Sequence, residues 1–525
     1  DWIKAGGKGK QPWDIDGFKL PGGPVWSKIG MMTWPAANAL YRKETFDNYP
    51  AARAILSAVF EGLQMPMDTA LRIESRYFAK IVRSPQAAAM IRSLFVSMQE
   101  LNKGARRPEA PASTLKKVGV LGAGLMGAGI AYVTALAGLE VVLIDRDQEA
   151  ADKGKGYSHK LLEAQVKRGR ATQKDADALL ARITATPDYE KLKGVDLVIE
   201  AVFEDRKVKA EATAKAQAVV GDKVVFGSNT STLPITSLAA QSKDPTNFIG
   251  IHFFSPVDRM MLVEIIMGEK TAAPALAVAL DYVRAIRKTP IVVNDSRGFY
   301  TSRVVGTYIR EGHLMLTEGV PPAMIENVGR MAGMPVGPLS LNDEVAVDLA
   351  WKILKATESD LGAKAIDARQ KALLEEMVEK RGRFGRKNGK GFYDYPQSGA
   401  KRLWPGLTDL QATKLDPDTL DVEELKARLL AIQALETARC FEEKVLTDVR
   451  EADVGSILGF GYAPYSGGTL SYIDMMGVKK FVALCEKLAQ KFGERFRPNQ
   501  LLLDMATKGE SFYSRFAPKR QKQAA

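Results

Sequence analysis

A set of closely spaced glycines between two apolar segments constrains this chain more than any other feature. An apolar run over 118–121 predicts a buried strand and leads directly into Gly122, Gly124 and Gly127. An apolar helical pattern follows, and a second strand-like run then ends at Asp145. Strand, glycine turn, helix, strand and carboxylate in this order are the fingerprint of a dinucleotide-binding fold.

Each part of this segment has a role in binding a dinucleotide. Gly122 allows the tight turn, Gly124 lets backbone N–H groups approach a pyrophosphate at the helix N-terminus, and Gly127 lets the helix pack closely on the strand. Asp145 lies 23 residues after Gly122 and is placed to accept hydrogen bonds from a ribose. A carboxylate there repels a 2′-phosphate, so we expect NAD rather than NADP, although Arg146 weakens this preference slightly.

The composition is that of a large globular protein. Its 525 residues suffice for about three or four domains, and 46% of them are hydrophobic. The two cysteines, Cys440 and Cys485, argue against a disulfide framework and fit a reducing compartment. The sequence shows no apolar run of transmembrane length, no signal peptide and no targeting signal over 519–525. The start at Asp1 rather than at methionine suggests a processed or shortened chain.

The formal net charge of +12 allows two interpretations. One is nucleic acid binding, and the other is lysines scattered over solvated faces together with a polyanionic small substrate. No dense basic run interleaved with aromatic residues occurs, so we expect no nucleic acid partner. We also expect no metal site.

Composition and periodicity divide the chain into an N-terminal part, an alternating part and a helical part. Residues 1–50 are rich in Gly, Pro and Trp and predict irregular structure, whereas 51–63 and 67–82 show helical spacing of apolar residues. A polar, proline-bearing linker over 102–114 suggests a domain border at about 110. Strand and helix patterns then alternate over 115–295, which predicts an α/β Rossmann-type domain with a parallel, doubly wound sheet.

The helical part contains a degenerate repeat. The segments 331–343 and 458–474 resemble each other, and each follows a long amphipathic helix, predicted over 301–316 and 424–442. We therefore expect two related all-α domains, at about 296–397 and 420–516, which could bury their apolar faces against each other within one chain. The alternative is a chance similarity between two Gly-Pro turns.

One of the three histidines, His252, closes an apolar strand predicted over 248–254. The apolar run 261–267 predicts the returning strand of a hairpin centred on Asp258. In such a hairpin His252 and Glu264 are direct cross-strand neighbours, with Cβ atoms ~5 Å apart.

This pairing suits the oxidation of a secondary alcohol. An inward-facing glutamate is costly to bury unless it is paired, and an imidazole removes that cost. The carboxylate would fix the tautomer of the ring and stabilise the imidazolium that forms when the ring takes a proton from a hydroxyl group. A purely structural pair is the alternative, but downstream of a dinucleotide fold we favour the catalytic interpretation.

Two further stretches belong to the expected cleft. Residues 201–204 follow one buried strand at the carboxyl edge where cofactors lie, and 228–232 follow another. The second stretch is rich in hydroxyl groups and carries the amide of Asn229. It could also cap a helix predicted over 233–240, and both roles are compatible because a capping loop presents free donors to an anion.

At these residues the chain resembles the L-3-hydroxyacyl-CoA dehydrogenase family, and within it the alpha subunits of multifunctional fatty-acid β-oxidation complexes. The resemblance is dense over about 115–395 and looser over 420–515. The matching motifs are 122–131, Ile199–Asp205, Ser228–Ser231, His252–Asp258, Gly298–Arg303 and Gly385–Tyr393.

The resemblance implies a set of site residues. The catalytic pair falls on His252 and Glu264, the donor to the substrate hydroxyl on Ser231, and a helper position on Ser302. Substrate contacts, including those near coenzyme A, fall on Lys160, Lys167 and Asn229. The implied NAD contacts are Gly122, Ala123, Gly124, Leu125, Met126, Gly127, Asp145, Ala201, Val202, Glu204, Lys209, Ser231, Ser255 and Lys387.

The chain departs from the family pattern in places. Single-function members carry Asn where this chain has Ser255 and Ser302, and a serine at 302 cannot supply an amide. Residues 1–110 resemble the tail of a crotonase-type enoyl-CoA hydratase domain with its joining helix, without the catalytic glutamates of that domain. The resemblance thus implies a parent protein with hydratase activity, of which this chain keeps the dehydrogenase.

We therefore expect NAD-dependent oxidation of L-3-hydroxyacyl-CoA to 3-ketoacyl-CoA. The expected partner is a thiolase subunit, the chain itself is expected to be monomeric through internal pairing, and the expected location is the bacterial cytoplasm or, in a eukaryote, the mitochondrial matrix. The alternatives are a β-hydroxyacid dehydrogenase with a lysine base, a UDP-sugar dehydrogenase with a nucleophilic cysteine, and a non-catalytic scaffold for thiolase subunits. The sequence lacks the lysine context of the first, and both cysteines lie far from the dinucleotide segment.

Overall fold

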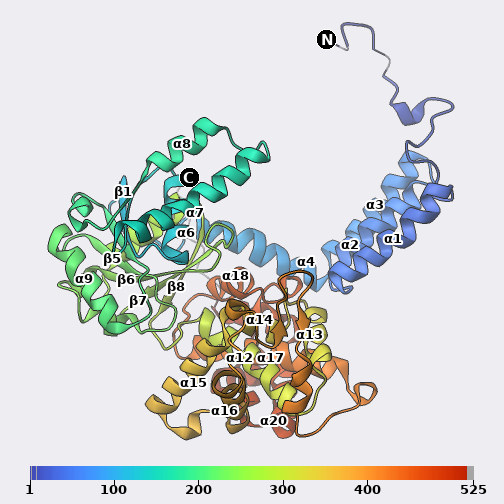
Figure 1. Ribbon diagram of the computed structural model, residues 1–525. Coiled ribbons are helices and arrows are strands. Elements are labelled where there is room, and N and C mark those ends of the chain that lie inside the picture. The colour runs from blue at the N-terminus through green and yellow to red at the C-terminus, as the bar shows by residue number, and fades with distance from the viewer. Residues whose placement is uncertain (2, 8, 517–525) are drawn as a thin grey trace. The chain divides into compact units, whose positions relative to one another are not determined.

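The structure is a computed structural model that describes residues 1–516 except residues 2 and 8 (Figure 1). The stretch 519–525, in which the sequence shows no targeting signal, lies outside the described residues. The chain divides into two compact units, Asp1–Ile91 and Arg92–Ala525. Within the described part, no helix is long and apolar enough to cross a membrane.

The smaller unit is helical. It contains α1 (Lys28–Thr45), α2 (Pro50–Gly62), α3 (Met67–Val82) and α4 (Pro85–Met90). The helices predicted over 51–63 and 67–82 are confirmed, but the prediction of irregular structure over 1–50 is wrong because α1 fills its second half. Ser27 caps this helix, and Pro35 lies inside it. An internal proline normally ends a helix, which is why the composition here did not indicate one.

A single eight-stranded sheet forms one half of the larger unit. The strand order is β3-β2-β1-β4-β5-β6-β7-β8, and neighbouring strands are parallel except for the antiparallel pair β6–β7. The strands are β1 (Lys117–Leu121), β2 (Glu140–Ile144), β3 (Ile183–Thr186), β4 (Leu197–Glu200), β5 (Val225–Ser228), β6 (Phe248–Phe253), β7 (Leu262–Met267) and β8 (Thr289–Asn294). The first six follow the order of dinucleotide-binding folds, so the predicted Rossmann-type fold is confirmed. The sequence pattern did not indicate β3 and β8.

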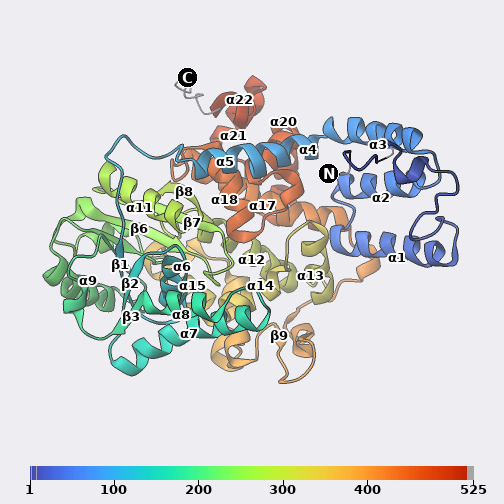
Figure 2. The same ribbon diagram turned by 90° about the horizontal axis from the view of Figure 1, so that it is seen from above.

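Helices cover both faces of this sheet (Figure 2). On one face the core is shared with α6 (Leu125–Leu136), α7 (Gln148–Lys167), α8 (Gln173–Ala181) and α11 (Ala273–Ala285). On the other face it is shared with α9 (Arg206–Val220) and α10 (Ile235–Ala239). This second core continues without a break into the helical half of the unit.

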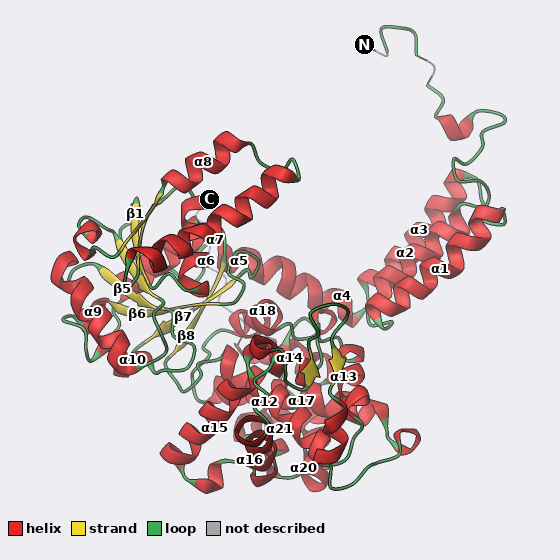
Figure 3. Cartoon of the chain, viewed as in Figure 1, coloured by secondary structure: helices red, strands yellow, loops and turns green. Residues whose placement is uncertain are grey.

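The rest of the larger unit is almost entirely helical (Figure 3). Its helices are α5 (Met98–Asn102), α12 (Thr301–Thr317), α13 (Pro322–Met331), α14 (Pro338–Val345), α15 (Val347–Leu361), α16 (Ala368–Glu375), α17 (Val422–Glu442), α18 (Val449–Phe460), α19 (Thr469–Met476), α20 (Val478–Phe492), α21 (Gln500–Lys508) and α22 (Phe512–Phe516). The short strands β9 (Tyr393–Asp394) and β10 (Arg402–Leu403) pair among them. The two long helices predicted from the sequence correspond to α12 and α17.

Two buried carboxylates organise the first part of this helical region. Glu326 on α13 accepts hydrogen bonds from the Leu339 N–H at 2.8 Å and from the Tyr393 hydroxyl at 2.8 Å. Asp343 on α14 accepts from the N–H groups of Phe392 and Tyr393 at 2.7 and 2.8 Å. Together they fasten the segment around Phe392 and Tyr393 to the start and end of α14.

The second part repeats this scheme. Asp453 on α18 accepts from the Leu470 N–H and from the Tyr513 hydroxyl, both at 2.9 Å. Asp474 on α19 accepts from the N–H groups of Phe512 and Tyr513 at 2.8 and 3.0 Å. Matching carboxylates that fasten matching Phe-Tyr pairs favour a true internal repeat over a chance similarity of two turns.

The long helices α12 and α17 pack against each other around a buried ion-pair network. The guanidinium of Arg428, a residue only 1% exposed, donates to Glu311 at 2.8 Å and to Glu318 at 2.7 Å. Arg495 donates to the same Glu311 at 2.7 Å. Buried charges are tolerated only when they are paired in this way, so the network fixes how the two helical parts meet.

Candidate active site

The register of the sheet brings the segments predicted to form the cleft to one edge. Leu121, Glu200, Ser228 and Gly250 lie in one row across the parallel strands β1, β4, β5 and β6. The glycine turn and the two cleft segments follow the first three residues of this row directly, and His252 lies two residues beyond Gly250. All of them therefore lie at the carboxyl ends of the strands, where ligands bind in open α/β sheets.

The glycines of the turn have the geometry that a dinucleotide requires. Gly122 has a φ of +91°, and a Cβ there would lie 2.7 Å from the Ala201 carbonyl oxygen. A Cβ on Gly127 would overlap the Gly122 carbonyl oxygen. At Gly124, by contrast, a Cβ would have no protein atom within 4 Å, so open space faces the N-terminus of α6. A pyrophosphate fits this space, where the helix dipole and free N–H groups favour an anion.

A cavity of about 630 Å³ opens beside this turn. Asp145 lies at its wall, and its carboxylate accepts from the Ala123 N–H at 2.6 Å and from the Arg146 N–H at 2.7 Å. Residues of α7, among them Tyr157 and Lys160, also line this cavity. The residues present thus fit the adenosine half of NAD.

His252 and Glu264 pair across β6 and β7, as the hairpin prediction required. His252 Nδ1 lies 2.9 Å from Glu264 Oε2, and the residues are 5% and 0% exposed. The rings of Phe254 and Phe299 lie beside the imidazole, with centroids at 4.6 and 6.2 Å. Among the described residues none forms a hydrogen bond with Nε2, so the outer ring nitrogen is available to a substrate.

A buried cluster of charges lies under the loop that follows β5. Lys209, 2% exposed, donates to both carboxylate oxygens of Glu200 at 3.0 Å and lies 3.2 Å from Glu204. Burial opposes ionisation of Glu204, but Lys209 and hydrogen bonds from Thr230 and Ser231 keep the pKa of its carboxyl below the usual value. Lys209 is therefore placed to orient Glu204 and the loop rather than to reach a cofactor itself.

The loop 228–232 is anchored to the strand that carries the histidine. Asn229 Oδ1 accepts from the Phe253 N–H at 2.7 Å, while the Ser231 N–H donates to Glu204 at 3.2 Å. The prediction that this loop caps a helix starting at residue 233 is wrong. The helix begins at Ile235, and the carboxylate of Asp295 accepts from its first N–H groups.

The turn after His252 is fastened by residues that the sequence analysis missed. The ammonium of Lys288 donates to the carbonyl oxygens of Val257 and Met260 at 2.6 and 2.5 Å, and burial lowers the pKa of this lysine to about 8. The Tyr157 hydroxyl donates to Asp258 at 2.8 Å, which ties the turn to the cavity wall. Neither contact follows from spacing in the sequence, because both join segments far apart in the chain.

The remaining predicted site residues lie at different depths. Ser255 is exposed in the turn, and Ser302 is half-buried in the first turn of α12. Lys387 forms an ion pair with Asp348 at 2.5 Å in the first helical part, away from the cavity lining. Lys160 lines the cavity, whereas Lys167 is exposed at the end of α7 and does not.

Comparison with known proteins decides the family. Residues 117–296 match the NAD-binding domain of 3-hydroxyacyl-CoA dehydrogenase, and residues 298–395 match its C-terminal domain. The chain belongs to the 3-hydroxyacyl-CoA dehydrogenase family. It is an NAD-dependent dehydrogenase of 3-hydroxyacyl-CoA compounds, as the resemblance implied.

A relative and two solved structures extend this match. The fatty acid oxidation complex subunit alpha of Shewanella amazonensis is 37% identical over 498 residues, which are 94% of this chain and 69% of that protein. 3-Hydroxybutyryl-CoA dehydrogenase from Escherichia coli is 26% identical with a TM-score of 0.65, and the match covers 76% of this chain and 99% of that chain. The dehydrogenase part of multifunctional enzyme 1 from C. elegans is 25% identical with a TM-score of 0.56, and the match covers 78% of this chain and 96% of that chain.

Proposed function

We propose that His252 is the proton acceptor in the oxidation of L-3-hydroxyacyl-CoA to 3-ketoacyl-CoA, with Glu264 as its partner. One observation carries this proposal: the pair is buried, with 2.9 Å between Nδ1 and Oε2, at the strand edge that also presents the glycine turn. Glu264 accepts the Nδ1 proton, so the lone pair that can take a proton is on Nε2. The carboxylate then stabilises the imidazolium that results.

Bound NAD would supply the acceptor for the hydride that leaves C3 of the substrate. The protein's own groups orient the reacting oxygen. The Ser231 hydroxyl is proposed as the donor to the substrate oxygen, and the amide nitrogen of Asn229 as a second contact, because Oδ1 is already taken by the Phe253 N–H. Ser302 and Ser255 are proposed to contribute hydroxyl groups where single-function members have amides.

The cofactor contacts are proposed along the edge of the sheet. Residues 122–127 with Asp145 bind the pyrophosphate and ribose, and the segment Ala201–Glu204 continues the contact surface. Lys209 acts through Glu204, with which it forms an ion pair. For Lys387 to contact the cofactor, its ion pair with Asp348 would have to open.

The basic residues of α7 are proposed to meet the phosphates of coenzyme A. Lys160 and Lys167 are both exposed and lie two turns apart on α7. This arrangement accounts for part of the positive charge of the chain through its substrate, and no nucleic acid partner is needed.

The proposed context is fatty-acid β-oxidation. Membership of a complex with a thiolase subunit, and an enoyl-CoA hydratase activity of the parent protein, are inferred from the subunit-alpha relative. The same proposal includes a cytoplasmic location and the pairing of the two helical parts within one chain. It also includes a four-part organisation of the chain, at 1–110, 115–295, 296–397 and 420–516. The buried network around Arg428 and Glu311 supports the pairing.

An assay across substrates tests the function. The chain should consume NADH with acetoacetyl-CoA and with longer 3-ketoacyl-CoA compounds, and it should not hydrate crotonyl-CoA. Absence of NADH consumption with every ketoacyl-CoA would favour the scaffold alternative. The His159→Gln variant, altered at an exposed histidine of α7, should match the parent chain.

A further inference from the structure

Glu264 has more partners than the histidine it orients. Its Oε1 accepts from the backbone N–H groups of Tyr300 and Thr301 at 3.0 and 3.1 Å. Its Oε2 accepts from His252 Nδ1 at 2.9 Å and from the Thr301 hydroxyl at 2.6 Å. Each carboxylate oxygen thus receives two donors, which saturates a carboxylate that is 0% exposed.

Thr301 is the first residue of α12 and the only one of these partners that contacts both oxygens. Its hydroxyl binds the same oxygen that holds the imidazole. A short hydrogen bond to an ionised acceptor is among the stronger ones in proteins. The direction of the Oε2 lone pairs, and with it the plane of the His252 ring, therefore depends on Thr301 as well as on the hairpin.

We propose that Thr301 is a positioning residue for the His252–Glu264 pair, in addition to the residues that the family resemblance implies. The inference rests on the proposed role of His252 as proton acceptor. The hydroxyl of Thr301 holds the Glu264 carboxylate in the rotamer that keeps the His252 Nε2 directed at the substrate oxygen. The adjacent Ser302 hydroxyl forms no hydrogen bond within the described residues, so Thr301 is the residue of this turn that acts on the pair.

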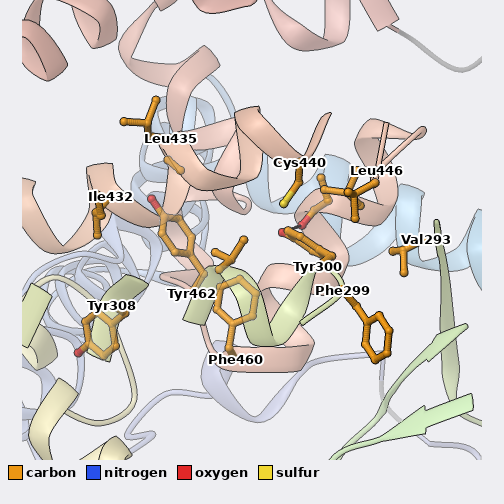
Figure 4. Packing of buried hydrophobic residues seen from close by; sticks show 14 of the residues in the cluster. Val293, Phe299, Tyr300, Tyr308, Ile432, Leu435, Cys440, Leu446, Phe460 and Tyr462 are labelled. Atoms are coloured by element: carbon orange, nitrogen blue, oxygen red, sulfur yellow. Dashed lines mark hydrogen bonds between the residues drawn. The ribbon is translucent and has the colours of Figure 1, made fainter. Parts of the chain in front are cut away.

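Residues of α18, in the second helical part, pack next to Tyr300 and Thr301. The Tyr300 hydroxyl donates to the Ala452 carbonyl oxygen of α18 at 2.7 Å, and its ring packs edge-to-face on Phe460 with centroids at 6.0 Å (Figure 4). A Cβ added to Gly459 would lie 3.2 Å from the Thr301 methyl group. The methyl group of Thr301 thus lies next to α18, whereas its hydroxyl bonds Glu264, so the roles of the methyl group and the hydroxyl can be tested separately.

Two substitutions separate the hydroxyl from the methyl group. Thr301→Val keeps the shape and loses the hydrogen bond, and we expect kcat to fall about ten-fold while KM for NAD stays within about two-fold. Thr301→Ser keeps the hydroxyl and should stay within about two-fold of the parent kcat. Thr307→Val is the matched control and should leave kcat unchanged, because among the described residues the hydroxyl of this buried threonine on α12 bonds only the Val304 carbonyl oxygen of its own helix.

The opposite result would overturn the proposal. If Thr301→Val retains full kcat while Thr301→Ser loses it, the residue acts through packing alone. If the parent chain oxidises no substrate, both the proposed function and this inference fail. If the parent chain is active and His252→Gln is inactive, but Thr301→Val is fully active, only the inference is refuted.

A spectroscopic measurement tests the geometry without turnover. The chain has three histidines, so nitrogen-15-labelled histidine gives few signals. Thr301→Val should move the ring-nitrogen resonances of His252 and leave those of His313, which bonds Asn342, in place. Unchanged His252 resonances in a folded variant would contradict the positioning role.

Discussion

The ammonium nitrogen of Lys209 lies 3.0 Å from each carboxylate oxygen of Glu200, and both residues are almost fully buried. Glu200 ends β4 and Lys209 lies on α9, so the pair joins the strand edge to the helix that covers it. The Ser228 hydroxyl donates to the same carboxylate from the end of β5. A buried carboxylate whose charge is balanced by one lysine cannot lose that lysine without a large cost in stability.

Replacing Lys209 with methionine should therefore destabilise the sheet domain. Glu200 would be left as an unpaired buried carboxylate, and we expect the free energy of unfolding to fall by about 3 kcal/mol. Urea denaturation followed by circular dichroism measures the change. Lys207→Met, at an exposed position on the same helix, is the control and should shift the midpoint little. Equal midpoints for the two variants would contradict the assigned role of Lys209.

The His252→Gln variant should lose turnover and retain the cofactor. Glutamine can bond Glu264 but cannot accept a proton at neutral pH, so kcat should fall about 100-fold or more. NADH affinity, measured by fluorescence titration, should be unchanged because the proposed pyrophosphate and ribose contacts, residues 122–127 and Asp145, follow β1 and β2 rather than β6. Near-normal turnover would remove His252 from its proposed role.

Two glycine variants should distinguish a glycine needed for NADH binding from one needed for stability. Gly124→Ala adds a methyl group into the open space at the start of α6, so we expect NADH affinity to fall about ten-fold or more with an unchanged melting temperature. Gly127→Ala overlaps the Gly122 carbonyl oxygen and should also lower the melting temperature. Gly156→Ala, which meets no atom within 4 Å on α7, serves as the control. Full NADH affinity in Gly124→Ala would place the pyrophosphate elsewhere.

Glu451 should make stability depend on pH. Burial raises its pKa to about 8 from an ordinary value of 4.5; nearby Asp448 adds to this rise, and Arg106 opposes it. The folded state therefore keeps a proton that the unfolded state has lost between these two values, and stability falls as pH rises across that window.

Glu451→Gln removes this dependence and keeps an acceptor for the Val292 N–H, which bonds Oε1 at 2.8 Å. The variant should gain stability over the parent as pH rises from 5 to 8, by at most about 1.4 kcal/mol per pH unit, and the gain should level off above pH 8. Melting temperatures of both proteins across this range provide the measurement. A constant difference would contradict the raised pKa.

The features that were predictable from the sequence are those that depend on local spacing. The glycine turn is one contiguous segment, and the hairpin register that pairs His252 with Glu264 follows from the position of one turn. The repeat was visible because Gly-Pro turns recur at matching places. In each case residues close in sequence determine the geometry.

The missed features depend on contacts between distant segments. Lys288 lies about 30 residues from the carbonyl groups it binds, and no periodicity indicates a buried lysine that serves a turn. Asp295 caps α10 from 60 residues away, whereas local spacing can indicate only the nearby hydroxyl-rich loop as a possible cap. The Thr301 hydroxyl reaches Glu264 only because α12 starts against β7, which is a matter of tertiary packing.

The two matching Phe-Tyr pairs, Phe392–Tyr393 and Phe512–Tyr513, and the carboxylates that bind them belong to one polypeptide. Dilution cannot separate two surfaces that are covalently joined, because their effective concentration is set by the length of the connecting chain. The contact between α12 and α17 is therefore expected to be independent of protein concentration, and mutations at Arg428 should appear as changes in folding stability rather than as changes in a dissociation constant.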